Sequence, residues 1–197
     1  MSAEILEAAQ PASGPPETSP AVVVRLAEPA EHAAVADLLE RAYTADYAIG
    51  DEYRASLRAV AERAAEHQVW VAARRDPEGD VLLGSVATPR PGRTISPLAR
   101  PGELDFRLLG VDPSARGQGV GRLLTRHVVD LARERGLVRV VMNSGPRMLP
   151  AHRLYASLGF ERLTERETHV VEGGTLLAFG LDVAPHPTPD PTHRTES

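Results

Sequence analysis

The chain has 197 residues, and its proportions of hydrophobic (42%) and charged (25%) residues are those of a soluble globular protein. This length suits one domain with a proper hydrophobic core. The formal net charge of −5 argues against non-specific binding to nucleic acid, which requires a basic surface. The absence of cysteine excludes disulfides, thiolate metal sites and cysteine nucleophiles, and it fits a reducing compartment.

The two ends of the chain differ in composition from its middle. Residues 1–20 are rich in Pro, Ala, Ser and Glu, and residues 184–197 alternate proline with polar residues. Neither segment can bury enough apolar surface to offset the entropy of ordering. We therefore predict two flexible tails, at 1–20 and 184–197, around a single domain at 21–183.

No stretch of the chain approaches the roughly 20 consecutive apolar residues that a membrane-spanning helix needs. The first 20 residues also lack the basic start and the apolar centre of a signal peptide. We expect a cytoplasmic protein without a membrane partner.

Hydrophobic periodicity predicts an alternation of strands and helices within the domain. The first half is expected to contain a strand at 21–26, a helix at 29–43, a second helix after Asp51, a hairpin of strands 68–75 and 81–88, and a loop at 89–102. The second half is expected to contain a strand at 103–111, a helix after the glycines that follow it, a strand at 137–142, a helix with Pro150 as its first residue, and strands near 160–168 and 175–182. Gly136 and Gly159 are placed to end the two helices of the second half. This order predicts a mixed sheet with helices on its faces.

A glycine-rich segment follows the strand at 103–111. In "VDPSARGQGVGRLLTRHVV" (111–129), Gly117, Gly119 and Gly121 alternate with other residues, and Arg116 stands just before them. Such a turn leading into a helix usually presents backbone N–H groups to an anion, and glycine permits both close approach and positive φ angles. A plain turn before a helix is the alternative.

Two common anion-binding motifs do not fit this segment. The dinucleotide fingerprint G-x-G-x-x-G fails because its third glycine falls on Arg122 or Leu124, depending on the register. The phosphate loop G-x-x-x-x-G-K-S/T fails because no lysine is near. The pattern that fits is Q/R-x-x-G-x-G/A, with Arg116, Gly119 and Gly121.

With this pattern, the segment "LDFRLLGVDPSARGQGVGRLL" and the later "AHRLYASLGF" resemble the GNAT superfamily of acyl-CoA N-acyltransferases. The resemblance covers the element order over about 21–182 and the motif detail over about 104–161. It implies a mixed α/β fold whose central, mostly antiparallel sheet contains one splayed pair of parallel strands and carries helices on both faces. It also implies acetyl-CoA as the co-substrate.

By the same resemblance, coenzyme A would lie along the strand and the glycine loop. The backbone of Leu109, Gly110 and Val111 would contact the pantetheine arm and help to polarise the thioester carbonyl. The pyrophosphate would be bound by Arg116, Gly117, Gln118, Gly119, Val120, Gly121 and Arg122. Asn143 could add a hydrogen bond, although Met148 stands where many relatives carry asparagine.

Gly110 lies within the predicted strand, where glycine suits a bulge or a close backbone approach. The alternative is that Gly110 only weakens the strand locally.

Tyr155 and Asp105 are the candidate catalytic residues that the resemblance implies. Tyr155 lies in the LY..LGF motif, where the family often places a general acid, and an ordinary tyrosine pKa of about 10 keeps the hydroxyl protonated at neutral pH. Packing in the core, on a face shared with Leu154, is the alternative role for Tyr155.

Asp105 takes the place of a glutamate that deprotonates the amine in many members of the family. The alternative is that Asp105 is a solvated charge on the surface. Glu103, on the same face, is expected to be a surface charge.

The acceptor side is less defined by the sequence. The connection "YTADYAIGDEY" (43–53) holds three tyrosines beside three acids, which suits a cationic amine. The alternative is that the tyrosines pack beneath a loop while Asp51 serves as the N-cap of the second helix.

We predict transfer of the acetyl group of acetyl-CoA to a primary amine of a small molecule or peptide, by direct attack in a ternary complex. A different acyl-CoA donor is one alternative, and a non-catalytic acyl-CoA-binding or regulatory module on the same fold is another. The histidines show no metal-ligand spacing, so no metal is expected. The expected partners are acetyl-CoA and an amine, without nucleic acid, and homodimerisation is left open.

Overall fold

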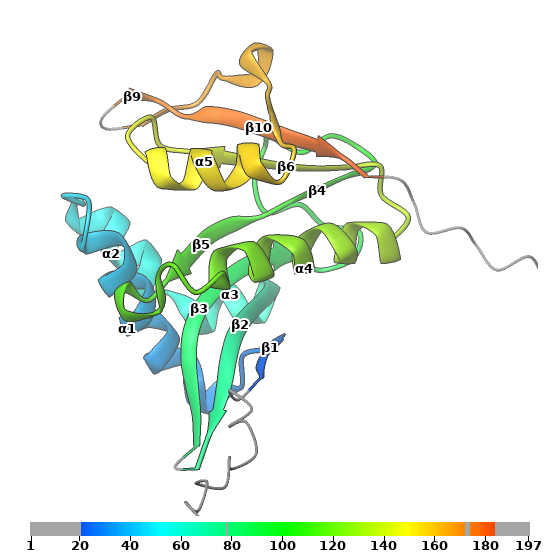
Figure 1. Ribbon diagram of the computed structural model, residues 1–197. Coiled ribbons are helices and arrows are strands. Elements are labelled where there is room, and N and C mark those ends of the chain that lie inside the picture. The colour runs from blue at the N-terminus through cyan, green and yellow to red at the C-terminus, as the bar shows by residue number, and fades with distance from the viewer. Residues whose placement is uncertain (1–20, 78, 172–173, 184–197) are drawn as a thin grey trace, which may run out of the picture.

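Two sheets form the centre of the molecule, and helices lie on both of their faces (Figure 1). The computed structural model describes residues 21–77, 79–171 and 174–183. The tails predicted at 1–20 and 184–197 lie outside the described residues. The mixed α/β class that the sequence predicts is confirmed.

Strands and helices alternate along the chain, broadly in the predicted order. The helices are α1 (His32–Thr44), α2 (Asp51–Arg58), α3 (Val60–Glu66), α4 (Val120–Glu134) and α5 (Leu149–Ser157), with 3-10 turns η1 (Pro29–Glu31), η2 (Pro113–Ala115) and η3 (Thr164–Arg166). The strands are β1 (Val22–Leu26), β2 (His67–Asp76), β3 (Gly79–Pro89), β4 (Glu103–Asp105), β5 (Arg107–Val111), β6 (Arg139–Ser144), β7 (Glu161–Arg162), β8 (Val170–Val171), β9 (Gly174–Thr175) and β10 (Leu177–Asp182). Within the described ranges, no helix combines the length and the apolar character needed to cross a membrane.

The two sheets meet at the segment that contains Phe106. One sheet has the order β1-β2-β3-β5 with antiparallel neighbours throughout. The other has the order β4-β6-β10-β7 and contains the parallel pair β4–β6. Because β4 and β5 are consecutive in the chain, Phe106 is where the chain leaves one sheet and joins the other. Beyond Phe106 the strands β5 and β6 separate, which is the splayed parallel pair that the resemblance implies.

The backbone of β5 is irregular at the same place. Leu108 has a φ of 54°, in the left-handed region that residues other than glycine seldom adopt. The pairing of β3 with β5 also shifts its register between Ser85 and Ala87. A bulge of this kind increases the local twist, and it turns β5 away from the direction of β4.

Three predicted elements differ in the structure. The helix expected after Asp51 is divided into α2 and α3, because Ala59 has a ψ of 52° that ends the first helix. The single strand expected at 103–111 is interrupted at Phe106. The strand expected near 160–168 is limited to β7, because the chain then turns through η3 and places Arg166 in a buried ion pair with Glu103.

The two larger hydrophobic clusters lie on opposite faces of the first sheet, and a small third cluster joins Leu98 of the 89–102 loop to Val141 and Ala178 of the second sheet. Along β2, Val69 and Val71 pack with α1, α2 and α3, whereas Trp70 and Ala72 pack with the cluster that contains the buried face of α4. This alternation is the period of two expected for a strand that is covered on both sides. The core therefore fixes both faces of the central strands and holds α1 and α4 on opposite sides.

The two predicted glycine caps are confirmed. Gly136 follows α4 with a φ of 67°, and the N–H of Leu137 donates to the carbonyl of Ala132 at 2.9 Å. Gly159 ends α5 in the same way, with a φ of 87°. Both ends are Schellman motifs, in which a left-handed residue lets the chain reverse over the last turn. Helix α5 begins at Leu149, so Pro150 is its second residue and not its first as predicted.

Phe106 provides a test of how much the packing at the sheet junction stabilises the fold. Its side chain is 1% exposed, and its ring makes edge contacts with Tyr155 and Phe160 at centroid distances of 6.1 and 6.5 Å. We expect Phe106→Ala to lower the free energy of unfolding by roughly 3–5 kcal/mol, measured by urea denaturation, because the chain cannot close the cavity. Val23→Thr, at a side chain that is 49% exposed on β1, is the control, and a similar loss in both variants would contradict this packing.

Candidate active site

A cleft of about 500 Å³ opens where β5 and β6 separate. Its walls come from the end of α1, the whole of β5, the glycine loop, the end of β6 and the first turns of α5. The predicted cofactor residues that line it are Leu109, Gly110, Val111, Arg116, Gly117, Gly119, Val120, Gly121, Arg122 and Asn143. Gln118 is the exception, because its side-chain amide donates instead to the carbonyl of Ser114 at 3.0 Å.

The glycine loop presents free backbone donors at the N-terminus of α4. Gly117 and Gly119 have φ values of 75° and 80°, and the ideal Cβ position at each meets nothing within 4 Å. Among the described residues, no hydrogen-bond acceptor faces the N–H groups of residues 117–122. These donors add to the positive end of the α4 dipole, so the loop has the geometry of an anion-binding site.

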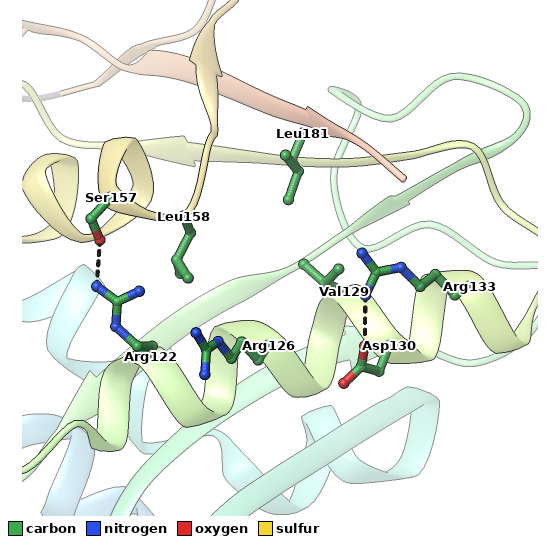
Figure 2. Close-up of a pocket in the computed structure, with 8 residues that line it drawn as sticks. All are labelled: Arg122, Arg126, Val129, Asp130, Arg133, Ser157, Leu158 and Leu181. Carbon is green, nitrogen blue, oxygen red and sulfur yellow. Dashed lines mark hydrogen bonds and ion pairs between the residues drawn. The ribbon is translucent and has the colours of Figure 1, made fainter. Parts of the chain in front are cut away.

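The two arginines that flank the loop are held by other elements. Nη2 of Arg116 donates to the carbonyl of Ala42 at 2.9 Å, and its Nη1 forms an ion pair with Asp46 at 2.8 Å. Nη2 of Arg122 donates to Oγ of Ser157 at 2.8 Å (Figure 2). Arg116 therefore attaches the loop to the end of α1, and Arg122 attaches the start of α4 to the end of α5.

A second, basic groove of about 340 Å³ continues from Arg122 along α4. Figure 2 shows Arg122, Arg126 and Arg133 on one side of this helix, with Leu158 and Leu181 on the facing elements. The groove and the cleft share Arg122. The groove is also lined by Asp130, which forms an ion pair with Arg133 at 2.8 Å, so Arg122 and Arg126 carry its unpaired positive charge among the described residues.

The outer edge of β5 faces the cleft. Because β5 is the last strand of its sheet, it has a strand partner only on the β3 side within the described residues. Gly110 packs closely against α1, since a Cβ there would lie 2.9 Å from Cδ2 of Leu39 and 3.3 Å from Cβ of Ala42. These neighbours are side chains and not backbone, and the bulge lies at Leu108.

Tyr155 lies both in the core and on the wall of the cleft. Its side chain is 3% exposed and packs against Phe160 and Phe179 at centroid distances of 5.7 and 5.9 Å. It is also part of the cleft lining. Burial raises the pKa of its hydroxyl well above the ordinary value, and the nearby Tyr47 adds to this rise. The hydroxyl is therefore a proton donor across the neutral and mildly alkaline range.

The structure does not bring Asp105 into the cleft lining. Its carboxylate is fully buried and accepts hydrogen bonds from the N–H groups of Ile95, at 3.1 Å, and Ser96, at 2.6 Å. Glu103 is also held inside, in a bidentate ion pair with Arg166 at 2.7 and 3.0 Å. Neither acid is a solvated surface charge, and each one fixes a neighbouring segment.

The described residues contain no metal site of the usual kind. Nowhere among them do three or more His, Cys, Asp or Glu side chains come together in a way that could hold a metal ion.

The acceptor segment contributes Tyr43, Asp46 and Tyr47 to the cleft. Tyr53 packs edge-on against Tyr43 at 5.8 Å, as the packing alternative expects. The N-cap of α2 is Gly50 and not the predicted Asp51, which is the first residue of the helix. Placed in the first turn, the Asp51 carboxylate complements the helix dipole instead of capping it.

Sequence reasoning missed Arg107, which lines the cleft from the start of β5. The alternation from Leu109 and Val111 gave no signal for it, because the register shift between Ser85 and Ala87 breaks that alternation before Arg107. Met148 also lines the cleft, so the position where many relatives carry asparagine is apolar here. Asn143 on β6 lines the same cleft.

The chain matches the model of the acetyltransferase (GNAT) family over residues 32–160. It is 35% identical over 108 residues to the N-alpha-acetyltransferase RimI of Mycobacterium tuberculosis, which covers 55% of this chain and 61% of that protein. It is 49% identical over 55 residues to a mycothiol acetyltransferase of Thermomonospora curvata, which covers 28% of this chain and 18% of the relative. These matches span less than two thirds of the relatives' own length.

Solved structures share the fold. An acetyltransferase of the GNAT family from Staphylococcus aureus Mu50 superposes with a TM-score of 0.64 at 11% identity, covering 83% of this chain and 100% of that one. The ribosomal-protein-S18-alanine N-acetyltransferase from Escherichia coli superposes with a TM-score of 0.60 at 18% identity, covering 83% and 95%. At these identities the likeness concerns the arrangement of the elements.

The placement of Asp105 gives a test of its role. We expect Asp105→Asn to lower the free energy of unfolding by about 1–3 kcal/mol, because the N–H groups of Ile95 and Ser96 lose a charged acceptor. Urea denaturation measures the loss, and hydrogen exchange at these two amides should become faster. Glu161→Gln, at an exposed carboxylate on β7, is the control. Unchanged stability with a large loss of turnover would assign Asp105 to the chemistry instead.

Proposed function

Because the chain belongs to the GNAT acetyltransferase family, we propose that it transfers the acetyl group of acetyl-CoA to a primary amine. The observation that carries this proposal is the cleft between β5 and β6, which has free N–H donors at one end and the Tyr155 hydroxyl in its wall. The shape suits a long, flexible thioester with a diphosphate at one end.

The donor would lie with its diphosphate at the glycine loop. The N–H groups of residues 117–122 would surround the two phosphates, and the groove at Arg122 and Arg126 would receive the remaining phosphate of coenzyme A. The pantetheine arm would extend along the outer edge of β5 and pair with its free backbone groups, as an added strand does. Asn143 on β6 faces the same space and would donate to the arm from the other side.

The reaction is a direct acyl transfer. The amine lone pair attacks the thioester carbonyl, and the backbone donors of β5 stabilise the negative charge on its oxygen. The C–S bond then breaks, and the leaving sulfur takes the proton of the Tyr155 hydroxyl. The new amide nitrogen loses its extra proton to water, and solvent returns a proton to Tyr155. Holding the two substrates together in this geometry supplies much of the rate.

We assign no side chain as the base. Among the described lining residues, Asp46 is the carboxylate of the cleft, and it is paired with Arg116. Asp105 lies outside the lining and is occupied by backbone donors. The amine therefore enters as its neutral form, and we propose that Asp105 acts by holding the 89–102 loop.

The placement of the diphosphate can be tested with two matched glycines. Gly119→Glu sets a carboxylate at the anion site, and we expect the Kd for CoA, measured by calorimetry, to rise about 100-fold, or about 3 kcal/mol. Gly92→Glu is the control, because Gly92 has a similar φ of 77°, open surroundings and a position outside the cleft. Both variants should lose similar stability from the left-handed backbone. Retained CoA binding in Gly119→Glu would show that this placement is wrong.

The role of Tyr155 can be tested by Tyr155→Phe in a thiol-release assay with acetyl-CoA and a panel of amines. We expect kcat to fall about 100-fold, because the leaving sulfur loses its acid, while the Kd for CoA is unchanged. Because the pKa of Tyr155 is raised, the wild-type protein should keep this acid as pH rises past the ordinary tyrosine range. An unchanged kcat would leave Tyr155 as a core aromatic. CoA binding without turnover of any amine would favour a binding module.

A further inference from the structure

One arginine of the cleft has no partner in the described structure. Arg116 and Arg122 are both held by hydrogen bonds to neighbouring elements. Arg107 also lines the cleft, but no hydrogen bond or ion pair to its guanidinium is present among the described residues. Its side chain is exposed at the start of β5, two residues before Leu109, whose carbonyl accepts a hydrogen bond from the hydroxyl of Tyr43 at 3.4 Å. The guanidinium is therefore available to a ligand on the acceptor side.

A second guanidinium near this region belongs to Arg63, which is not part of the cleft lining. Arg63, on α3, donates from Nη2 to the carbonyl of Ser56, but its Nη1 is buried and has no partner among the described residues. Burial lowers the pKa of Arg63, and the positive charge of Arg107 lowers it further. The neighbouring Glu62 makes no ion pair with either guanidinium within the described residues. Two positive groups thus act on each other without a carboxylate between them.

The hydroxyls of Tyr43 and Tyr53 complete this region. Burial raises the pKa of both hydroxyls, and the positive charge of Arg107 opposes the rise. Both hydroxyls therefore remain neutral hydrogen-bond donors beside the cation at neutral pH. The buried Nη1 of Arg63 lacks an acceptor among the described residues, and the charges of Arg63 and Arg107 repel each other, so an anion bound at Arg107 would reduce this repulsion.

We propose that Arg107, supported by Arg63, forms a subsite for an anionic group of the acceptor, and that this group is a carboxylate. The acceptor would then be an amine that carries its own carboxylate, such as an amino acid. A guanidinium binds a carboxylate through two parallel N–H···O bonds, which also orients the rest of the molecule. This proposal rests on the proposed function, because it defines the class of amine that the cleft accepts.

The test compares acceptors that differ only in the anion. Acetyl transfer is measured with each common amino acid, with its amide and with its decarboxylated amine, and with O-phosphoethanolamine against ethanolamine. We expect the kcat/KM of the best amino acid to exceed at least tenfold that of its two counterparts that lack the carboxylate. A preference for O-phosphoethanolamine over every amino acid would overturn the assignment to a carboxylate, and a preference for amines without an anionic group would overturn the subsite.

The variants locate the effect. Arg107→Gln should raise KM for the best amino acid at least tenfold, leave kcat/KM for its decarboxylated amine unchanged, and leave the Kd for CoA unchanged. Arg107→Lys should restore part of the loss. Arg75→Gln, at an exposed arginine near the turn of the β2–β3 hairpin, is the control and should change neither substrate. Equal losses for the amino acid and for its decarboxylated amine would overturn the proposal.

A binding measurement separates this proposal from the failure of catalysis. N-acetylglycine and its methylamide are titrated into the CoA-bound protein by calorimetry. We expect N-acetylglycine to bind more tightly than the methylamide, and Arg107→Gln to remove the difference. If this holds while no amine is acetylated, the subsite stands and the proposed transferase function fails. If both compounds bind equally, the subsite is wrong whatever the protein catalyses.

Discussion

The cleft depends on a constraint of hydrogen bonding: a single strand cannot stay paired with two neighbours that diverge. The chain pairs with β6 through β4, and after Phe106 it pairs with β3 through β5. The edge of β5 that faces β6 therefore has backbone groups that need a partner, and an extended ligand can supply one. Phe106 fills the base of the divergence together with Tyr155 and Phe160, so the opening is wedge-shaped and ends in packed aromatic rings.

Positive charge is distributed over the cleft by different means at its two ends. At the donor end, the glycine loop offers backbone donors, and Arg122 is already oriented by Ser157. Such groups lose little freedom when a diphosphate binds, because they are held before it arrives. At the proposed acceptor end, Arg107 is exposed and makes no hydrogen bond or ion pair among the described residues. The proposed donor end thus has preformed geometry, whereas a ligand at Arg107 would have to order that side chain as it binds.

Features with a local cause could be predicted from the sequence, and features with a distant cause could not. Gly136 and Gly159 end their helices as predicted because a left-handed cap is a property of a few consecutive residues. The break at Phe106 has no such signal, since "ELDFRLLGV" has the composition of one continuous strand, and its division depends on which strands pair with each half. Asp105 is similar: the N–H donors to its carboxylate come from a loop that folds back over β4, and the sequence of the strand gives no sign of that contact.

The ion pair of Arg116 with Asp46 has a thermodynamic consequence. The same arginine belongs to the loop at the start of α4 and holds the carbonyl of Ala42, so the wall on the acceptor side is attached to the loop on the donor side. A ligand that fixes Arg116 at the loop would then also act on Asp46 at the end of α1. Linkage makes any such effect reciprocal: whatever free energy the first substrate contributes to the affinity of the second, the second returns to the first. The ion pair is thus the contact through which the two halves of the cleft would be coupled.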